Sequence, residues 1–151
     1  AQAHQVEEYL RHVATKSDMD RKMAETKTGV FTGAFAVHPL TGQKVPIWVA
    51  DYVLSGYGTG AVMAVPAHDE RDFAFARENN LPIRRVIMGE NSTTEDLPFT
   101  GEGTTIDSGS FSGLTSVQCR EKITETLSQG GKGSAEIAYK LRDWVTTALS
   151  C

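Results

Sequence analysis

The chain has few cysteines and no long apolar run. Its two cysteines, Cys119 and Cys151, lie far apart in the sequence, which argues against a disulfide framework and favours a reducing compartment. No apolar stretch approaches the roughly 20 residues that a helix needs to cross a membrane. No secretory signal pattern opens the chain, and its first residue is Ala1 rather than Met. We therefore expect a fragment of a longer protein, with no membrane partner.

A surplus of basic residues is also missing. The 15 Lys and Arg residues are outnumbered by 19 Asp and Glu residues, for a formal net charge of -4. A protein that holds nucleic acid along its length needs a basic face, so we expect no DNA partner, whereas contact with one end of a nucleic acid stays compatible with this charge. The hydrophobic content of 40% is typical of a soluble globular fold, and 151 residues suffice for one domain.

Hydrophobic periodicity predicts four helices. In chain order they cover residues 6–13, with Val6, Leu10 and Val13 on one face; residues 17–29, capped by Ser17 and Asp18 and ended by Gly29; residues 69–80, stopped by Asn79 and Asn80; and residues 116–129, with Val117, Ile123 and Leu127 as apolar positions and Gly130 after them. The caps follow from the preference of Ser and Asp for helix starts and of Gly and Asn for helix ends.

Short apolar runs rich in Val, Ile and aromatic residues predict strands between these helices. The runs are Phe31 with Ala34–Val37, Pro46–Leu54, Ala61–Val65, Pro82–Met88, a short strand near Thr105, and Glu136–Leu141. The turn Pro39–Gly42 predicts a hairpin between the first two. Because the strands cluster and do not alternate with helices, the pattern favours an α+β fold with a mixed or antiparallel sheet over a doubly wound parallel sheet.

The glycine run Gly56–Ala61 satisfies the G-x-G-x-x-[GA] pattern of dinucleotide-binding folds. That fingerprint requires a helix that starts within it, so that the pyrophosphate meets the helix amides. Here the strand-like Val62–Val65 and Pro66 follow instead. We therefore interpret the run as a link between strands, and a helix directly after Gly60 would be needed to revive a nucleotide-binding α/β enzyme.

Ionisable side chains gather in the segment from Val65 to Asp72. Asp69 is a good helix cap, and Asp69 with Asp72 resembles a capping box. A functional interpretation is also open, in which Asp72 projects toward a cleft and holds a cation. His68 is interpreted as a surface or helix-start residue, because no second His or Cys lies at a metal-ligand spacing. Cys119 is expected to be buried in a helix, and Trp48 and Trp144 to pack in or beside the core.

Long blocks of the chain closely resemble the editing insertion of bacterial and organellar leucyl-tRNA synthetases. The blocks are Thr32-Gly33, Ala36–Gly42, Val45–Leu54 and Tyr57–Asp72, and Tyr139–Trp144 resembles the segment that returns to the catalytic domain. The resemblance covers nearly the whole chain to Trp144, and Gly58–Asp72 is a specific signal because it is long and ordered. Isoleucyl and valyl enzymes share a less close pattern.

The resemblance implies a fold and an activity. The fold is a β-barrel-like core with flanking helices, of the type found in class I valyl, isoleucyl and leucyl editing domains. The activity is post-transfer editing, the hydrolysis of the ester in mischarged tRNA, within a leucine–tRNA ligase. Amino acids that resemble leucine differ from it by a methyl group or its position. Such a difference gives only about 1–3 kcal/mol of discrimination in an apolar pocket. The implied partners are the 3′ end of mischarged tRNA(Leu) and the rest of the parent synthetase.

The same resemblance implies site residues. Asp72 matches the aspartate that holds the α-ammonium of the misattached amino acid, which keeps its amine but has lost its carboxylate. Water attacks the ester, helped by the free hydroxyl of the terminal adenosine, so no metal or other cofactor is expected for editing. ATP and Mg²⁺ belong to the ligase site of the parent protein. The implied substrate-binding residues are Tyr57, Thr59, Met63, Val65, Asp69 and Arg71.

Two departures from the family pattern limit these expectations. The family's upstream threonine-rich strand, which forms the other half of the pocket, is absent, and the family's continuation after Asp143-Trp144 is replaced by Val145–Cys151. We therefore expect an editing domain over residues 1–144, a divergent or truncated tail over residues 145–151, and no tRNA charging by this chain alone. An alternative is a truncated, non-catalytic remnant that binds a tRNA end or a protein. The expected compartment is the cytoplasm, or the chloroplast or mitochondrion in a eukaryote.

Overall fold

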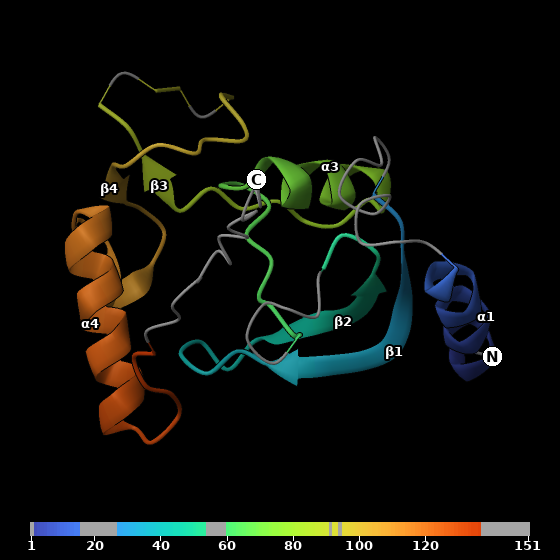
Figure 1. Ribbon diagram of the computed structural model, residues 1–151. Helices are drawn as coiled ribbons and strands as arrows, with labels where there is room; N and C mark the ends of the chain where they lie inside the picture. Colours follow the sequence, from blue (N-terminus) through green and yellow to red (C-terminus); the bar gives the residue numbers. More distant parts are fainter. Residues whose placement is uncertain (1, 16–26, 54–59, 91, 94, 137–151) are drawn as a thin grey trace, which may run out of the picture.

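The computed structural model describes residues 2–15, 27–53, 60–90, 92–93 and 95–136. Its elements are, in chain order, α1 (Gln2–Ala14), β1 (Gly29–Val37), β2 (Lys44–Ala50), α3 (Glu70–Glu78), β3 (Ile87–Met88), β4 (Thr104–Thr105), the 3-10 turn η1 (Gly109–Phe111) and α4 (Ser116–Gln129). Figure 1 shows α3 lying over the β1–β2 pair, α1 beside β1, and α4 on the opposite side with β3 and β4 at its end. No helix among these residues is long and apolar enough to span a membrane.

The first two strands form the predicted antiparallel hairpin, in which Phe31 lies opposite Trp48. Val, Ile, Phe and Trp are enriched in strands, but no residue of either strand is fully buried, and the second half of β1 is exposed. The register shifts between Phe31 and Phe35, where Gly33 has a φ of 80°. Glycine adopts this left-handed conformation at little cost, so the bulge leaves Phe31 and Phe35 in edge contact, with ring centroids 5.5 Å apart.

The aromatic side chain of Phe75 joins α3 to the hairpin. Its ring packs edge-on against Trp48, with centroids 5.5 Å apart, and lies 5.4 Å from the ring of Tyr52. Phe75 and Ala76 are buried. A Cβ atom on Gly29 would lie 2.7 Å from the Phe75 ring, so this close packing of α3 on β1 requires glycine at the start of the strand.

A buried carboxylate ties α1 to both strands of the hairpin. Asp51, just after β2, is 1% exposed and accepts hydrogen bonds from the backbone N–H and the hydroxyl of Thr28, at 3.0 and 2.7 Å. The hydroxyl of Tyr9, on α1, donates to the carbonyl of Thr28 at 2.7 Å. Burial is the main cause that raises the pKa of Tyr9. These contacts hold the end of β2, and therefore the next residue, Tyr52, in a fixed place.

The second half of the described chain builds around Arg85 and α4. Arg85 is 9% exposed, and its guanidinium lies over the ring of Phe99 at 5.0 Å. Its donors bind the carbonyls of Ile87 and Thr93 and the hydroxyl of Ser92, which satisfies a charge that would otherwise be costly to bury. The ammonium of Lys132, after α4, donates to the carbonyl of Pro39 at 3.1 Å, so this half also contacts the hairpin turn.

Most of the predicted elements are confirmed. The first, third and fourth helices match α1, α3 and α4, the hairpin matches β1 and β2, and the short strand near Thr105 matches β4. Cys119 is buried in α4, as predicted, whereas Val117, one of the predicted apolar positions, is 51% exposed. The second predicted helix falls largely on residues 16–26, and the last predicted strand falls on residues 137–141, both outside the described residues.

Four predictions of local structure were wrong. Gly29 begins β1 instead of ending a helix, β2 stops at Ala50 rather than Leu54, and only the last two residues of Pro82–Met88 form a strand. Ala61–Val65 is not a strand. A strand exists only with a hydrogen-bonded partner, and none of the described strands pairs with this segment.

The mixture of helices and antiparallel strands confirms the α+β prediction. The described residues form two separate sheets of two strands each, β1–β2 and β3–β4. No closed barrel is present within that part of the chain, so the barrel-like detail stays a prediction.

Candidate functional site

The loop before α3 and the first turn of α3 contain most of the predicted site residues. Asp69 is the cap of α3, and its Oδ1 accepts from the backbone N–H of Arg71 at 2.9 Å and of Asp72 at 3.1 Å. Burial pushes the pKa of Asp69 upward, but these two amides and the Arg71 guanidinium outweigh it and hold that pKa below its ordinary value. The predicted cap is therefore confirmed, whereas the capping box is wrong, because the Asp69 N–H donates to the carbonyl of Val65.

The side chain of Asp72 is largely buried. Asp72 is 9% exposed. One oxygen, Oδ1, accepts from the hydroxyl of Tyr52 at 2.9 Å, and the other, Oδ2, accepts from the backbone N–H of Val65 at 2.8 Å. A carboxylate offers about four acceptor positions, so the described residues leave about two for a further donor. An anion with that spare capacity can bind an ammonium group.

Tyr52 remains a hydrogen-bond donor at this site. It follows β2, and burial together with the hydrogen bond to Asp72 raises the pKa of its phenol far above the ordinary value of 10.0. The negative charges of Asp72 and Asp69 act in the same direction, and Arg71 opposes them. The phenol therefore stays protonated in neutral solution and donates to the carboxylate.

An exposed apolar segment leads into the site. Met63 is 59% exposed, Val65 is 49% exposed and Val62 is 53% exposed, although all three are large hydrophobic residues. Their exposure leaves apolar surface next to the residues that bind Asp72, and such surface marks a place where a ligand or another chain can bind. Residues 61–65 are not helical and α3 begins only at Glu70, so the helix needed for a dinucleotide site is absent after the glycine run.

The structure brings together some of the predicted site residues and leaves others undescribed. Val65 contacts Asp72 directly, and Arg71 forms an ion pair with Asp69 at 3.6 Å, with an Arg71 side chain that is 62% exposed. Met63 lies two residues before Val65 on the same exposed segment. Tyr57 and Thr59 lie outside the described residues. The binding roles of all six residues, and the role of Asp72, stay predictions.

His68 connects the loop before α3, here called the site loop, to two later segments. The sequence did not reveal these contacts. Its Nε2 accepts from the backbone N–H of Val86 at 3.2 Å, and its Nδ1 is 2.8 Å from the carbonyl of Phe99. Because Nε2 accepts, the ring proton is on Nδ1, which donates to that carbonyl. The N–H of Phe99 donates in turn to Ala67 at 2.9 Å. The prediction of a helix-start residue is confirmed, but His68 is half-buried and bound at both nitrogens rather than a surface residue.

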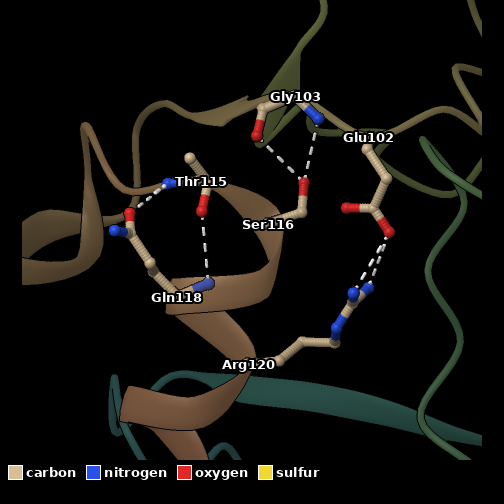
Figure 2. Close-up of polar contacts among 6 residues, drawn as sticks. All are labelled: Glu102, Gly103, Thr115, Ser116, Gln118 and Arg120. Carbon is tan, nitrogen blue, oxygen red and sulfur yellow. Dashed lines mark hydrogen bonds and ion pairs between the residues drawn. The ribbon is translucent and has the colours of Figure 1, made fainter.

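A separate cavity of about 860 Å³ lies at the N-terminus of α4, among residues that include Met88, Phe99, Glu102, Gly103 and Ser116. None of its lining residues belongs to the predicted site. Figure 2 shows that the polar groups beside it bind one another. The Ser116 hydroxyl bridges the N–H and the carbonyl of Gly103, and Arg120 pairs with Glu102 at 3.1 Å. These contacts satisfy the polar groups at the start of α4. We therefore assign them a structural role.

The start of α4 is also capped by side chains within its own first turn. The side chain of Thr115 accepts from the N–H of Gln118 at 3.3 Å, and the side chain of Gln118 accepts from the N–H of Thr115 at 3.1 Å (Figure 2). This is a complete capping box. Across the described ranges, no three His, Cys, Asp or Glu side chains lie close enough together to hold a metal ion.

Comparisons with known proteins agree on one family. Residues 1–128 match the family described as "Leucyl-tRNA synthetase, editing domain". The leucine–tRNA ligase of Clostridium perfringens strain 13 is 54% identical over 147 residues, which are 97% of this chain and 18% of that protein. The leucine–tRNA ligase of Clostridium beijerinckii is 50% identical over 143 residues, 94% of this chain and again 18% of that protein.

A solved structure has the same fold. It is the ternary complex of the agnB2 LeuRS of Agrobacterium radiobacter K84 with tRNA and LeuAMS, and it superposes with a TM-score of 0.63 at 35% sequence identity. The match covers 86% of this chain and 14% of that one. The chain therefore spans less than a fifth of the length of these relatives. It belongs to the leucine–tRNA ligase family and matches that family's editing domain.

Proposed function

We propose that this chain is the editing segment of a longer leucine–tRNA ligase, here called the parent ligase, and that it hydrolyses amino acids wrongly attached to tRNA(Leu). Water attacks the carbonyl carbon of the ester, the bond to the ribose oxygen breaks, and the products are a free amino acid and a tRNA with its terminal hydroxyl restored. The match to the editing domain supports the activity. Selection against neighbours of leucine needs this second step, because one methyl group yields only about 1–3 kcal/mol.

The single observation that carries the proposal is the environment of Asp72. A carboxylate that is 9% exposed, with one hydrogen bond on each oxygen, is oriented by the protein but not saturated. The α-ammonium of an esterified amino acid supplies the missing donors and positive charge. A charge-assisted bond of this kind binds the substrate and aligns its carbonyl, so Asp72 acts as an anchor and not as a general base.

The remaining predicted residues have supporting roles in this proposal. Met63 and Val65, which are exposed and apolar, contact the amino acid side chain, and Tyr57 and Thr59 are two further substrate-binding residues. Asp69 and Arg71, paired at 3.6 Å, contact the terminal adenosine. The free hydroxyl of that adenosine assists the attack. Editing uses no metal or cofactor in this scheme, and ATP and Mg²⁺ act only at the ligase site of the parent protein.

The proposed partners are the 3′ end of mischarged tRNA(Leu) and the rest of the parent ligase. The Agrobacterium relative is a complex with tRNA, which supports the first. In the parent ligase we propose that the two described sheets belong to a barrel-like core completed by further strands. The proposed compartment is that of translation, the cytoplasm or an organelle.

The test measures hydrolysis of isoleucyl-tRNA(Leu) and norvalyl-tRNA(Leu) by the parent ligase and its Asp72→Ala variant. Loss of a charged hydrogen bond costs about 1.5–3 kcal/mol, so kcat/KM should fall by roughly ten- to hundredfold. Asp107→Asn is the control, because the Asp107 side chain is 70% exposed and pairs only with Arg84, at 3.9 Å, among the described ion pairs, and because asparagine tolerates the φ of 49° at this position.

Leucine charging should be unchanged in both variants, which shows that the parent ligase is folded. Equal hydrolysis by the wild type and by Asp72→Ala would remove Asp72 from its role. Absence of hydrolysis in the wild type would contradict the editing proposal.

A further inference from the structure

Tyr52 provides the one side-chain hydrogen bond to the Asp72 carboxylate among the residues that the structure describes. The other bond comes from a backbone N–H, that of Val65. The two residues reach the carboxylate from different elements: Tyr52 follows β2, and Val65 lies on the exposed segment before α3. The direction of the carboxylate is therefore set from two sides, and one of the two contacts depends on a hydroxyl group.

The hydroxyl of Tyr52 is itself held in a fixed place. Its ring lies against the ring of Phe75, with centroids 5.4 Å apart, and Phe75 is 5% exposed and one helical turn beyond Asp72. The preceding residue, Asp51, is 1% exposed and bonded to Thr28. A tyrosine whose backbone and ring are both fixed loses little further freedom when it makes a hydrogen bond.

We propose that Tyr52 is a positioning residue, whose hydroxyl fixes the orientation of the Asp72 carboxylate so that its unused acceptor positions face the α-ammonium of the substrate. This inference rests on the proposed editing function. With Tyr52 on Oδ1 and Val65 on Oδ2, each oxygen keeps about one acceptor position. Rotation of the carboxylate would break one of the two bonds, so both together hold it in one plane.

Tyr52 does not act as a proton-transfer group in this arrangement. Its single proton is directed at Oδ1 of Asp72, and the raised pKa of its phenol keeps that proton in place in neutral solution. Its effect on the reaction passes through Asp72. Removal of the hydroxyl should therefore lower kcat/KM only for substrates whose α-ammonium binds the Asp72 carboxylate.

The experiment compares two esters in the parent ligase, isoleucyl-tRNA(Leu) and its deaminated analogue, in which a hydrogen replaces the α-amine and leaves no donor for the Asp72 carboxylate. The variant is Tyr52→Phe, which keeps the ring against Phe75 and removes the oxygen. The control is Thr124→Val, which removes a hydroxyl that donates to the carbonyl of Arg120 at 2.8 Å within α4. Leucine charging and thermal unfolding report whether each variant is folded.

We expect Tyr52→Phe to lower kcat/KM for isoleucyl-tRNA about tenfold, the effect of one hydrogen bond to a charged group. The deaminated ester should change by less than about twofold, since it makes no ammonium contact. Thr124→Val should leave the hydrolysis of both esters unchanged. The double variant Tyr52→Phe/Asp72→Ala should be no slower on isoleucyl-tRNA than Asp72→Ala alone, because the hydroxyl acts through that carboxylate.

The outcomes separate this inference from the proposed function. If Tyr52→Phe slows both esters equally, or slows neither, while Asp72→Ala slows isoleucyl-tRNA, the positioning role is wrong and the editing function stands. If Asp72→Ala behaves as the wild type, the anchor role of Asp72 is wrong and the positioning role of Tyr52 fails with it, although hydrolysis itself stands. If the wild type does not hydrolyse isoleucyl-tRNA, the proposed function fails.

Discussion

Replacement of His68 by alanine should loosen the connection between the site loop and the segments around Val86 and Phe99. The wild-type imidazole accepts from the N–H of Val86 at 3.2 Å and donates to the carbonyl of Phe99 at 2.8 Å. Each hydrogen bond contributes about 1 kcal/mol net, so the loss of both lowers the free energy of local opening by about 2 kcal/mol. Val86 is only half-buried, and water partly replaces the lost acceptor, which makes this an upper figure.

The assay is hydrogen–deuterium exchange of the parent ligase, followed in peptides that contain Val86 and Phe99. A change of about 2 kcal/mol corresponds to an exchange rate roughly 30-fold faster at the Val86 amide. The Phe99 amide, which donates to Ala67 at 2.9 Å, should also exchange faster because its segment is no longer held by His68. Peptides of α4 should be unaffected.

The control is His38→Ala. His38 accepts through Nδ1 from the amides of Leu40 and Thr41, both at 3.3 Å, so its loss should raise exchange in the hairpin turn and leave Val86 unchanged. If exchange at Val86 is the same in His68→Ala and the wild type, the imidazole does not hold these segments, and the reasoning from its two contacts is refuted.

Two further changes test the geometry of the fold. Asp69→Ala should destabilise α3 by about 1 kcal/mol through loss of its cap. The pKa of Asp69 is held below its ordinary 3.8, so the carboxylate contributes its full stabilisation of α3 above pH 3.8 and loses it as the pH falls through the pKa of the folded state. Asp69→Asn should keep the cap and remove this pH dependence, as measured by hydrogen exchange in α3 between about pH 2.5 and 5. Gly103→Ala should separate β3 from β4, because its Cβ would lie 2.2 Å from the carbonyl oxygen of Met88, at a cost of about 1–3 kcal/mol or more. Gly133→Ala, with its nearest atom at 3.5 Å, is the control, and equal exchange in the β3 and β4 peptides of the two variants would contradict the clash.

The elements that could be predicted from the sequence are those whose signals are local. The helix Ser116–Gln129 has matching bounds in the structure, because apolar spacing and the glycines after it define a helix without reference to other segments. The cap at Asp69 and the stop at Asn79 depend on backbone groups within a few residues. Such contacts are short in sequence, and residue type alone favours them.

The features that could not be predicted depend on contacts between distant residues. The segment Ala61–Val65 has the composition of a strand, but strand formation requires a partner, and periodicity does not show whether one is adjacent. The hydrogen bond between Tyr52 and Asp72 joins residues that are 20 positions apart. In the sequence, Tyr52 is one more residue of the apolar run Pro46–Leu54, so nothing indicates this contact. His68 binds residues 18 and 31 positions away, which no local pattern encodes.

One residue explains why the two aspartates at the start of α3 have different roles. The carbonyl of Val65 accepts the N–H of Asp69 at 3.1 Å, which removes the donor that the Asp72 side chain would bind in a capping box. The N–H of Val65 then binds the Asp72 carboxylate at 2.8 Å. The backbone of Val65 thus satisfies the helix start and at the same time turns Asp72 toward the interior. Because Asp69 caps the helix, the Asp72 carboxylate is not used as a cap, and in the proposed function it binds an ammonium group beside an exposed apolar segment.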